Sequence, residues 1–237
     1  MSLQPMDLEH EGVAFRGAVA RPAGEGPFPA VLVMHSAVGL NAFYRSKPAL
    51  LAERGWLAVA TNLYGDQVDV ASEASYGAAY MEYLQSPEKV RERTIAWFEA
   101  IAARPDVDAS RMAAIGYCFG GHCVLELARG GAEAKAVVSY HGTLKTHAAM
   151  EPGAFKGHIA AYCGAQDPYA PMEDITALRK ELEAAGARYA MHVFAEVAHG
   201  FTDPDAAKHG QPGIAYDAVA EKVSWAGTLA LLDEVLR

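Results

Sequence analysis

The stretch Gly116-Tyr117-Cys118-Phe119-Gly120 decides the fold of this chain. It reads G-x-C-x-G and stands between an apolar run, residues 112–115, and a small-residue segment, residues 121–128. That order is typical of a nucleophile elbow, a strained strand-to-helix turn that exposes one side chain above a sheet. The glycines suit the turn because the helix must pack close to the strand, which leaves little room for a Cβ. The usual occupant is serine, so the sequence predicts a thiol nucleophile at Cys118.

Apolar runs alternate with helical patterns along the rest of the chain. This alternation predicts an α/β fold with a mostly parallel central sheet and helices on both faces. A more alternating run, residues 13–19, is expected at an antiparallel edge. The 237 residues contain no linker, repeat or low-complexity tract, so residues 1–237 are expected to form one domain. The expected parallel strands are residues 29–35, 56–63, 111–116, 136–140, 158–163 and 189–194.

Local start and stop signals predict several helices. Ser86-Pro87-Glu88 combines an N-cap serine, a proline at the first helical position and an acid, and apolar residues follow at helical spacing. Pro171 begins a second candidate that Gly186 ends, and residues 215–236 form a long amphipathic segment. Residues 63–83 contain two glycines and several tyrosines and are the least regular part, which indicates a lid or pocket rim.

Charge and cysteine content narrow the class of protein. Acidic residues outnumber basic ones, 29 against 20, and no Lys/Arg cluster stands out, so no nucleic-acid partner is expected. The N-terminus lacks the pattern of a signal peptide, and no apolar run approaches the ~18 residues of a membrane span. The three cysteines, Cys118, Cys123 and Cys163, show no CxxC spacing, which suits a reducing cytoplasm. We expect a cytoplasmic monomer or homodimer that does not bind a membrane.

A cysteine nucleophile needs a histidine to take its proton and a carboxylate to orient that histidine. In α/β-hydrolase order, the acid and the base follow the nucleophile along the chain. Asp167 comes soon after the expected strand 158–163, and His199 soon after the expected strand 189–194. Both would emerge at carboxyl ends of strands, where open α/β sheets place their sites. The sequence therefore predicts a triad of Cys118, Asp167 and His199.

An oxyanion hole requires two backbone N–H groups. One is expected from Phe119, the residue after the nucleophile, and the other from Ser36 or Ala37 in the loop after strand 29–35. Gly39 would let that loop turn tightly, and His35 is expected to support it.

Three side chains are candidate substrate contacts: Ser36, Tyr80 and His141. His141 follows the strand 136–140 and can line the pocket, although a solvent-facing loop position is almost equally compatible with the sequence. The tyrosines at 76, 80 and 83 suit a substrate-facing lid, but packing on a helix face is an equal alternative. The remaining histidines show no ligand spacing, so no metal site is expected.

These motifs resemble the dienelactone hydrolase family of α/β-hydrolases, from about residue 13 to the C-terminus. The resemblance implies the α/β-hydrolase fold and the hydrolysis of small esters or lactones, without a metal or an organic cofactor. It also implies a Cys-His-Asp triad at Cys118, His199 and Asp167 and oxyanion donors at Phe119 and Ala37. The matching motifs are Gly116-Tyr117-Cys118-Phe119-Gly120-Gly121, Gly39-Leu40-Asn41, Asn62-Leu63-Tyr64-Gly65, Asp167-Pro168 and His199-Gly200-Phe201.

Two departures from the family pattern concern the substrate. Dienelactone-cleaving members carry a glutamate just before the second oxyanion donor, where this chain has Ser36. They also bind the substrate carboxylate through arginines, where this chain has Tyr76 and Tyr80 in the lid region and Asp203 after the histidine motif. A carboxylate in place of a cation would repel a carboxylate-bearing lactone. We therefore expect a different small ester or lactone as the substrate.

The missing glutamate also predicts the resting state of the thiol. Ser36 cannot compete as a charged partner, so Cys118 is free to form a standing ion pair with His199, which would lower the pKa of the thiol. Two other functions stay open: a non-catalytic ligand-binding protein on the same fold, and a thiol redox sensor that uses Cys118. A sensor would need a resolving cysteine, and Cys123 lies one to two helical turns further on.

Overall fold

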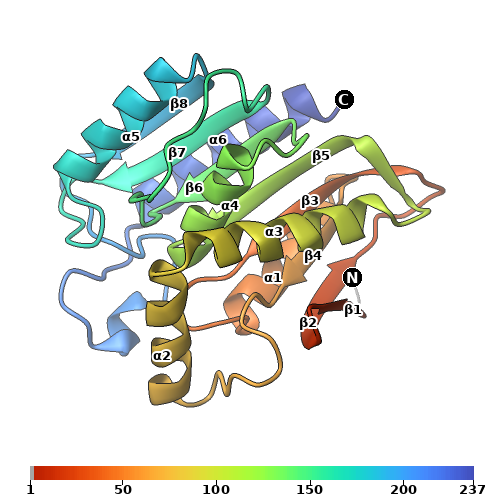
Figure 1. Cartoon of the computed structure of the whole chain (residues 1–237), viewed down its shortest axis with the longest axis horizontal. Coiled ribbons are helices and arrows are strands. Elements are labelled where there is room, and N and C mark those ends of the chain that lie inside the picture. The colour runs from red at the N-terminus through yellow and green to blue at the C-terminus, as the bar shows by residue number, and fades with distance from the viewer. Residues whose placement is uncertain (1–2) are drawn as a thin grey trace.

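The computed structural model describes residues 3–237, except for the side chain of His209. Its strands form one sheet in the order β1-β2-β4-β3-β5-β6-β7-β8 (Figure 1). Strands β3 to β8 are parallel to one another, whereas β2 pairs antiparallel with both β1 and β4. This confirms the predicted α/β-hydrolase architecture. The strands are β1 (Gln4–His10), β2 (Val13–Ala20), β3 (Phe28–Met34), β4 (Leu57–Thr61), β5 (Val107–Tyr117), β6 (Ala136–Tyr140), β7 (His158–Gly164) and β8 (Arg188–Phe194).

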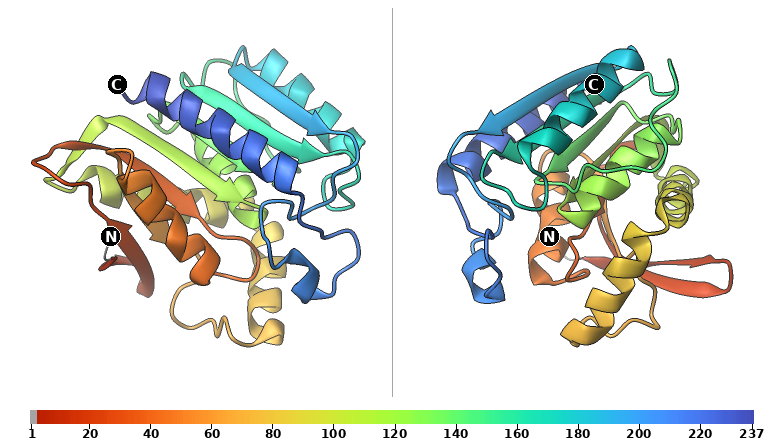
Figure 2. Two further views of the ribbon diagram at one scale, coloured as in Figure 1. Left: turned by 180° about the vertical axis from the view of Figure 1, so that it is seen from behind. Right: turned by 60° about the vertical axis from the view of Figure 1, so that its left-hand side comes forward.

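Helices cover both faces of the sheet, as the views from the front and from behind show (Figure 1, Figure 2). The face toward the viewer in Figure 1 carries α2 to α5, and the opposite face carries α1 and α6. Because both faces are covered, the central strands are apolar along nearly their whole length instead of alternating. The helices are α1 (Ala42–Ala52), α2 (Glu73–Leu84), α3 (Pro87–Ala102), α4 (Phe119–Arg129), α5 (Met172–Ala184) and α6 (Ala218–Val235), with a short 3-10 helix η1 (Ala206–His209).

Two expectations about the periphery of the fold were incomplete. Strand β2 is antiparallel as predicted, but it is not the edge, because β1 pairs with it on the outside. Residues 63–83, expected to be irregular, contain helix α2 in their second half, where the side chain of Ser72 accepts a hydrogen bond from the Ser75 N–H. The helices expected after Ser86 and Pro171 and at the C-terminus are present as α3, α5 and α6.

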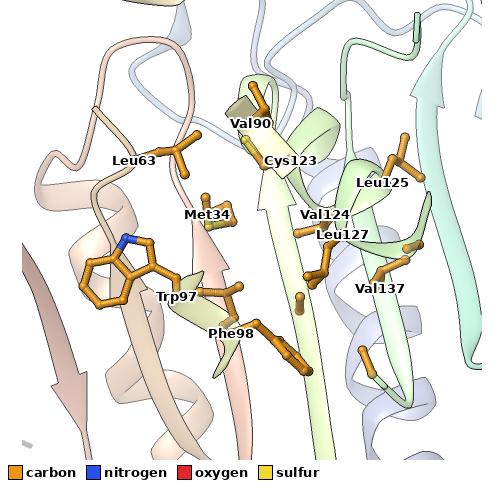
Figure 3. Packing of buried hydrophobic residues seen from close by; sticks show 14 of the residues in the cluster. Met34, Leu63, Val90, Trp97, Phe98, Cys123, Val124, Leu125, Leu127 and Val137 are labelled. Atoms are coloured by element: carbon orange, nitrogen blue, oxygen red, sulfur yellow. The ribbon is translucent and has the colours of Figure 1, made fainter. Parts of the chain in front are cut away.

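The larger of two hydrophobic cores lies between the sheet and the helices α3, α4 and α5. Figure 3 shows its centre, where Trp97 and Phe98 of α3 lie beside Met34 of β3 and face Val124 and Leu127 of α4. Burial of apolar side chains at this density fixes α4 against the sheet, and α4 begins directly after Cys118. The core therefore determines where the sulfur stands.

The carboxyl ends of the parallel strands point toward the end of the molecule where α2 and η1 lie (Figure 1). The loops after β3, β5, β7 and β8 all leave the sheet at this end. These loops contain the residues that the sequence singled out for chemistry. Within residues 3–237, no helix combines the length and apolar character that crossing a bilayer requires.

Candidate active site

Cys118 occupies a strained turn between β5 and α4. Its backbone has φ 53° and ψ −114°, a conformation that side-chain-bearing residues rarely adopt. The glycines around it are required by space: a Cβ on Gly116 would lie 1.9 Å from the Gly120 carbonyl oxygen, and a Cβ on Gly120 would lie 2.4 Å from the Met34 carbonyl oxygen. This is the geometry of the predicted nucleophile elbow.

The loops after β7 and β8 are held together by their main chains. The Gln166 N–H donates to the Val197 carbonyl at 3.0 Å. A Cβ on Gly164 would lie 2.2 Å from the same carbonyl oxygen, so only glycine permits this approach. The main chain of His199 is fixed in turn, because its N–H donates to the Gly213 carbonyl at 2.9 Å. The backbone contacts between these loops therefore bring Asp167 and His199 close together.

The side chains of Asp167 and His199 are buried and hydrogen-bonded to each other. Nδ1 of His199 lies 2.7 Å from Oδ2 of Asp167. The other carboxylate oxygen, Oδ1, accepts the backbone N–H groups of Tyr169 at 2.7 Å and Ala170 at 3.1 Å. Because both carboxylate oxygens accept hydrogen bonds, Asp167 fixes the tautomer of His199, with Nδ1 protonated and Nε2 left for another partner.

That other partner is Cys118, which lines the same cavity as His199 and interacts with its ring. Burial opposes ionisation of both groups, yet each stabilises the charge of the other. Burial alone would raise the pKa of Cys118, but the charge and hydrogen bond of His199 lower it overall. Burial alone would lower the pKa of His199, but the Cys118 thiolate and the Asp167 carboxylate raise it to about 10. Both shifts are in the direction of the expected thiolate–imidazolium pair.

The two expected oxyanion donors converge on the same sulfur. The backbone N–H groups of Ala37 and Phe119 interact with the Cys118 sulfur and lower the pKa of its thiol further. Ala37 lies in the loop after β3, where Gly39 has φ 80° and its N–H closes a turn onto the Ser36 carbonyl at 3.0 Å. Phe119 is the first residue of α4, so its N–H also lies at the positive end of a helix.

A cavity of about 400 Å³ opens above Cys118. Four tyrosines, Tyr44, Tyr76, Tyr80 and Tyr169, line it together with Cys118 and His199. Acidic side chains, Glu73 and Asp203, also line it, and Lys208 lies among the lining residues. The cavity therefore combines aromatic walls with charged side chains of both signs.

The predicted substrate contacts Ser36, Tyr80 and His141 all line this cavity. His141 is buried, its ring meets that of His199 edge-on at 5.1 Å, and its Nε2 lies 2.9 Å from Thr202 Oγ1. Burial, and then the charge of His199, hold the pKa of His141 well below its usual value. A neutral His141 can therefore cover one side of His199 without repelling it. The solvent-facing alternative for His141 was wrong.

The tyrosines expected in the lid have different environments. Tyr76 and Tyr80 of α2 face the cavity, whereas Tyr83 is buried beneath it, where its hydroxyl contacts the Leu63 carbonyl. Tyr44 and Tyr169 also line the cavity and were not singled out from the sequence. Tyr169 stands two residues after Asp167, so its position beside the acid was a signal that could have identified it.

A second hollow, of about 610 Å³, lies at the opposite end of the sheet. It is lined by residues at the amino ends of β6, β7 and β8, such as Lys135, His158 and Arg188. None of the predicted site residues borders it. Because ligands of α/β sheets bind at the carboxyl ends of strands, the smaller cavity above Cys118 is the candidate active site.

The chain matches the dienelactone hydrolase family model over residues 15–236. The protein belongs to the dienelactone hydrolase family. Membership identifies it as a hydrolase of ester or lactone bonds and confirms the resemblance read from its motifs.

Individual relatives support the same assignment. The crystal structure of the dienelactone hydrolase-like promiscuous phosphotriesterase P91, from metagenomic libraries, has a TM-score of 0.94 and 34% identity, covering 100% of this chain and 99% of that one. Protein K02A2.1 of Caenorhabditis elegans is 32% identical over 62% of this chain and 94% of its own length. A Salmonella typhimurium protein named "Putative carboxymethylenebutenolidase" is 27% identical over 77% of this chain and 71% of its own length.

Proposed function

We propose that the protein hydrolyses a small ester or lactone through a triad of Cys118, His199 and Asp167 and a covalent acyl-enzyme. The observation that carries this proposal is the buried pair of His199 and Asp167, joined at 2.7 Å, whose imidazole ring lines the same cavity as Cys118 and lowers the pKa of its thiol. A nucleophile, a base and an orienting acid in that sequence are the minimum machinery of acyl transfer.

In the first half of the reaction, the Cys118 thiolate adds to the substrate carbonyl carbon. The carbonyl electrons move onto oxygen, and the N–H groups of Ala37 and Phe119 bind this oxyanion. The adduct collapses, the C–O bond to the leaving group breaks, and the alkoxide takes the Nε2 proton of His199. The products of this half are an alcohol and a thioester on Cys118, with His199 neutral.

In the second half, a water molecule attacks the thioester carbonyl while Nε2 of His199 takes its proton. The second adduct expels the Cys118 thiolate, releases the carboxylic acid and restores the ion pair. A thiolate is itself readily expelled from a tetrahedral adduct, so alkoxide or enolate leaving groups suit this site better than amines. Amide hydrolysis is therefore disfavoured.

The cavity walls bear on the choice of substrate. The lining contains the acidic side chains of Glu73 and Asp203 and the basic side chain of Lys208. Lys208 is already paired with Asp205 at 2.7 Å, so the acidic groups leave the lining unfavourable for a carboxylate. The tyrosines of the lining suit neutral acyl or aryl groups. We infer a preference for uncharged esters and lactones over a carboxylate-bearing dienelactone.

Hydrolysis of a chromogenic acetate by the wild type, Cys118→Ala and His199→Ala tests the proposal. We expect both variants to lose nearly all activity. Intact mass should show a transient acyl adduct on the wild type only, and a proteolytic digest should place that adduct on the peptide that contains Cys118. Equal activity in all three proteins would contradict the triad. Rapid sulfenic acid formation on Cys118 without turnover would instead favour the redox sensor.

The similarity to P91 favours one additional candidate activity, the hydrolysis of neutral phosphotriesters. A phosphotriester carries no charge, so the acidic side chains of the cavity do not exclude it. The donors that bind a carbonyl oxyanion can also bind a phosphoryl oxygen. Release of 4-nitrophenol from a dialkyl 4-nitrophenyl phosphate by the wild type, and its loss in Cys118→Ala, would support this activity. No release above the Cys118→Ala background would eliminate it.

A further inference from the structure

The orientation of the Ala37 N–H depends on the peptide units on either side of this residue. In a trans peptide unit the C=O of one residue and the N–H of the next are held in one plane and point in opposite directions. The direction of the Ala37 N–H is therefore set by the Ser36 carbonyl, which belongs to the same unit. The Ala37 carbonyl belongs to the following unit and fixes the other side of the residue.

The Ser36 carbonyl is held by the side chain of His35. Nδ1 of His35 lies 2.6 Å from the Ser36 carbonyl oxygen, and Nε2 accepts the Leu63 backbone N–H at 3.0 Å. A carbonyl can only accept and a backbone N–H can only donate, so Nδ1 carries the proton and Nε2 does not. His35 is thereby locked in one neutral tautomer. Burial lowers the pKa of His35 to about 4, which keeps the ring neutral at physiological pH.

The Ala37 carbonyl is held by Tyr64, whose hydroxyl donates to it at 2.7 Å. The Tyr64 ring also stacks on the ring of Phe119, with centroids 5.7 Å apart and planes inclined by 17°. Phe119 supplies the second expected oxyanion donor. Tyr64, which is fully buried, therefore contacts both residues whose N–H groups face the Cys118 sulfur.

We propose that His35 and Tyr64 are positioning residues that aim the Ala37 N–H at the oxyanion. Their hydrogen bonds hold the two peptide units on either side of Ala37 in place, and the stacking of Tyr64 on Phe119 fixes the distance between these peptide units and Phe119. The proposal rests on the mechanism above and adds to it the two side chains that set its oxyanion hole. Neither side chain lines the cavity, so neither acts by touching the substrate.

Two variants of His35 separate positioning from simple support of the fold. Asparagine places an amide N–H where Nδ1 stood and can still donate to the Ser36 carbonyl, whereas leucine cannot. Both variants leave the Leu63 N–H without its acceptor, so they carry the same structural defect. The N–H of Gly39 continues to hold the Ser36 carbonyl in both, which limits the loss.

We expect His35→Leu to lower kcat for a chromogenic acetate by about 10-fold or more with little change in KM, because misaligned donors weaken transition-state binding selectively. His35→Asn should recover most of this loss. The iodoacetamide alkylation of Cys118 should move to higher pH in His35→Leu only, since the same N–H stabilises the resting thiolate. This second readout would not respond to a merely structural defect.

Tyr64→Phe and Tyr140→Phe form a second, independent pair. Both hydroxyls are buried hydrogen-bond donors, but Tyr140 donates to Thr228 of α6, away from the loop after β3. We expect Tyr64→Phe to lower kcat and raise the alkylation pH, and Tyr140→Phe to do neither. If neither His35 variant folds, this pair still tests whether the Ala37 N–H is positioned by its neighbours.

A kcat for His35→Leu within about twofold of the wild type, or equal losses in His35→Leu and His35→Asn, would overturn the role of His35. Equal kcat values for Tyr64→Phe and Tyr140→Phe would overturn that of Tyr64. Failure of the proposed function is distinguishable, because Cys118→Ala would then keep its activity. Loss of activity in Cys118→Ala with unaffected His35 and Tyr64 variants would reject the positioning role alone.

Discussion

The same residue types occur in two regions of this molecule, the site at the carboxyl ends of the strands and the scaffold behind it. Tyr64 donates its hydroxyl to a loop carbonyl beside Cys118, whereas Tyr140 donates its hydroxyl to α6 on the opposite face of the sheet. Both are fully buried in aromatic stacks, Tyr64 against Phe119 and Tyr140 against Tyr117 at 4.7 Å. Burial and residue type are alike, and only the partner of the hydroxyl differs.

Two further pairs extend the comparison. Asp167 and Asp217 each accept backbone N–H groups two and three residues ahead, but only Asp167 also holds a histidine. Cys118 is partly exposed and has a lowered pKa, whereas Cys123 is fully buried, and burial raises its pKa well above the usual value. Local environment, not residue type, therefore distinguishes the residues proposed to act in catalysis from those that only stabilise the fold.

The cysteine pair should give the largest difference. Removal of the nucleophile in Cys118→Ala should lower kcat by about 10⁴-fold or more, as for the nucleophile of other covalent hydrolases. Cys123→Ala should leave kcat unchanged and lower the free energy of unfolding by about 1–2 kcal/mol through the small cavity it creates. Steady-state kinetics would measure kcat of both variants, and denaturant unfolding would measure their stability. Comparable kcat losses in Cys118→Ala and Cys123→Ala would contradict a special role for Cys118.

The aspartate pair should give the next largest difference. Asp167→Asn keeps an oxygen for the backbone N–H groups but presents an amide N–H to Nδ1 of His199, which favours the wrong tautomer. We expect kcat to fall by roughly 10²–10⁴-fold. Asp217→Asn should change kcat little and stability by only a few tenths of a kcal/mol, because asparagine is an equally good N-cap. A catalytically competent Asp167→Asn enzyme would show that another group orients His199.

The tyrosine pair should give the smallest difference and is the sharpest test of the comparison. Tyr140→Phe should lower the free energy of unfolding by about 1 kcal/mol, the usual value of one buried hydrogen bond, without changing kcat. Thermal unfolding alongside kinetics would detect it. A kcat loss in this variant would mean that the stacked rings of Tyr140 and Tyr117 also affect the geometry of the candidate site.

Most of the candidate site could be predicted because its signals are local. The elbow glycines, the order of Cys118, Asp167 and His199, and their places after strands are all visible in the sequence. Tyr64 was not identified as a positioning residue because its partners, the Ala37 carbonyl and the Phe119 ring, are distant along the chain. His35 was expected to support the loop, but its tautomer depends on the Leu63 N–H from a different strand end.

The fold was predicted well from its centre to the β8 edge and less well at the β1 edge. Parallel strands buried on both faces are continuous apolar runs, so β3 to β7 were readily found. The edge strand β1 was missed because it is half exposed and contains Pro5, Asp7 and Glu9, which weaken a strand pattern. Helix α2 was missed because its glycine and tyrosines obscure a helical period, and its contacts with α3 stabilise it instead.

The central claim, that Cys118 rests as a thiolate paired with His199, is tested most directly by the rate of iodoacetamide alkylation against pH. A lowered thiol pKa means that the thiolate persists below the pH at which a free cysteine protonates, and that the rate falls only as pH drops through the lowered value. We predict an inflection well below that of a free cysteine in the wild type and a shift to higher pH in His199→Ala. A single wild-type inflection at about 8.5, the value for a free thiol, would contradict the account.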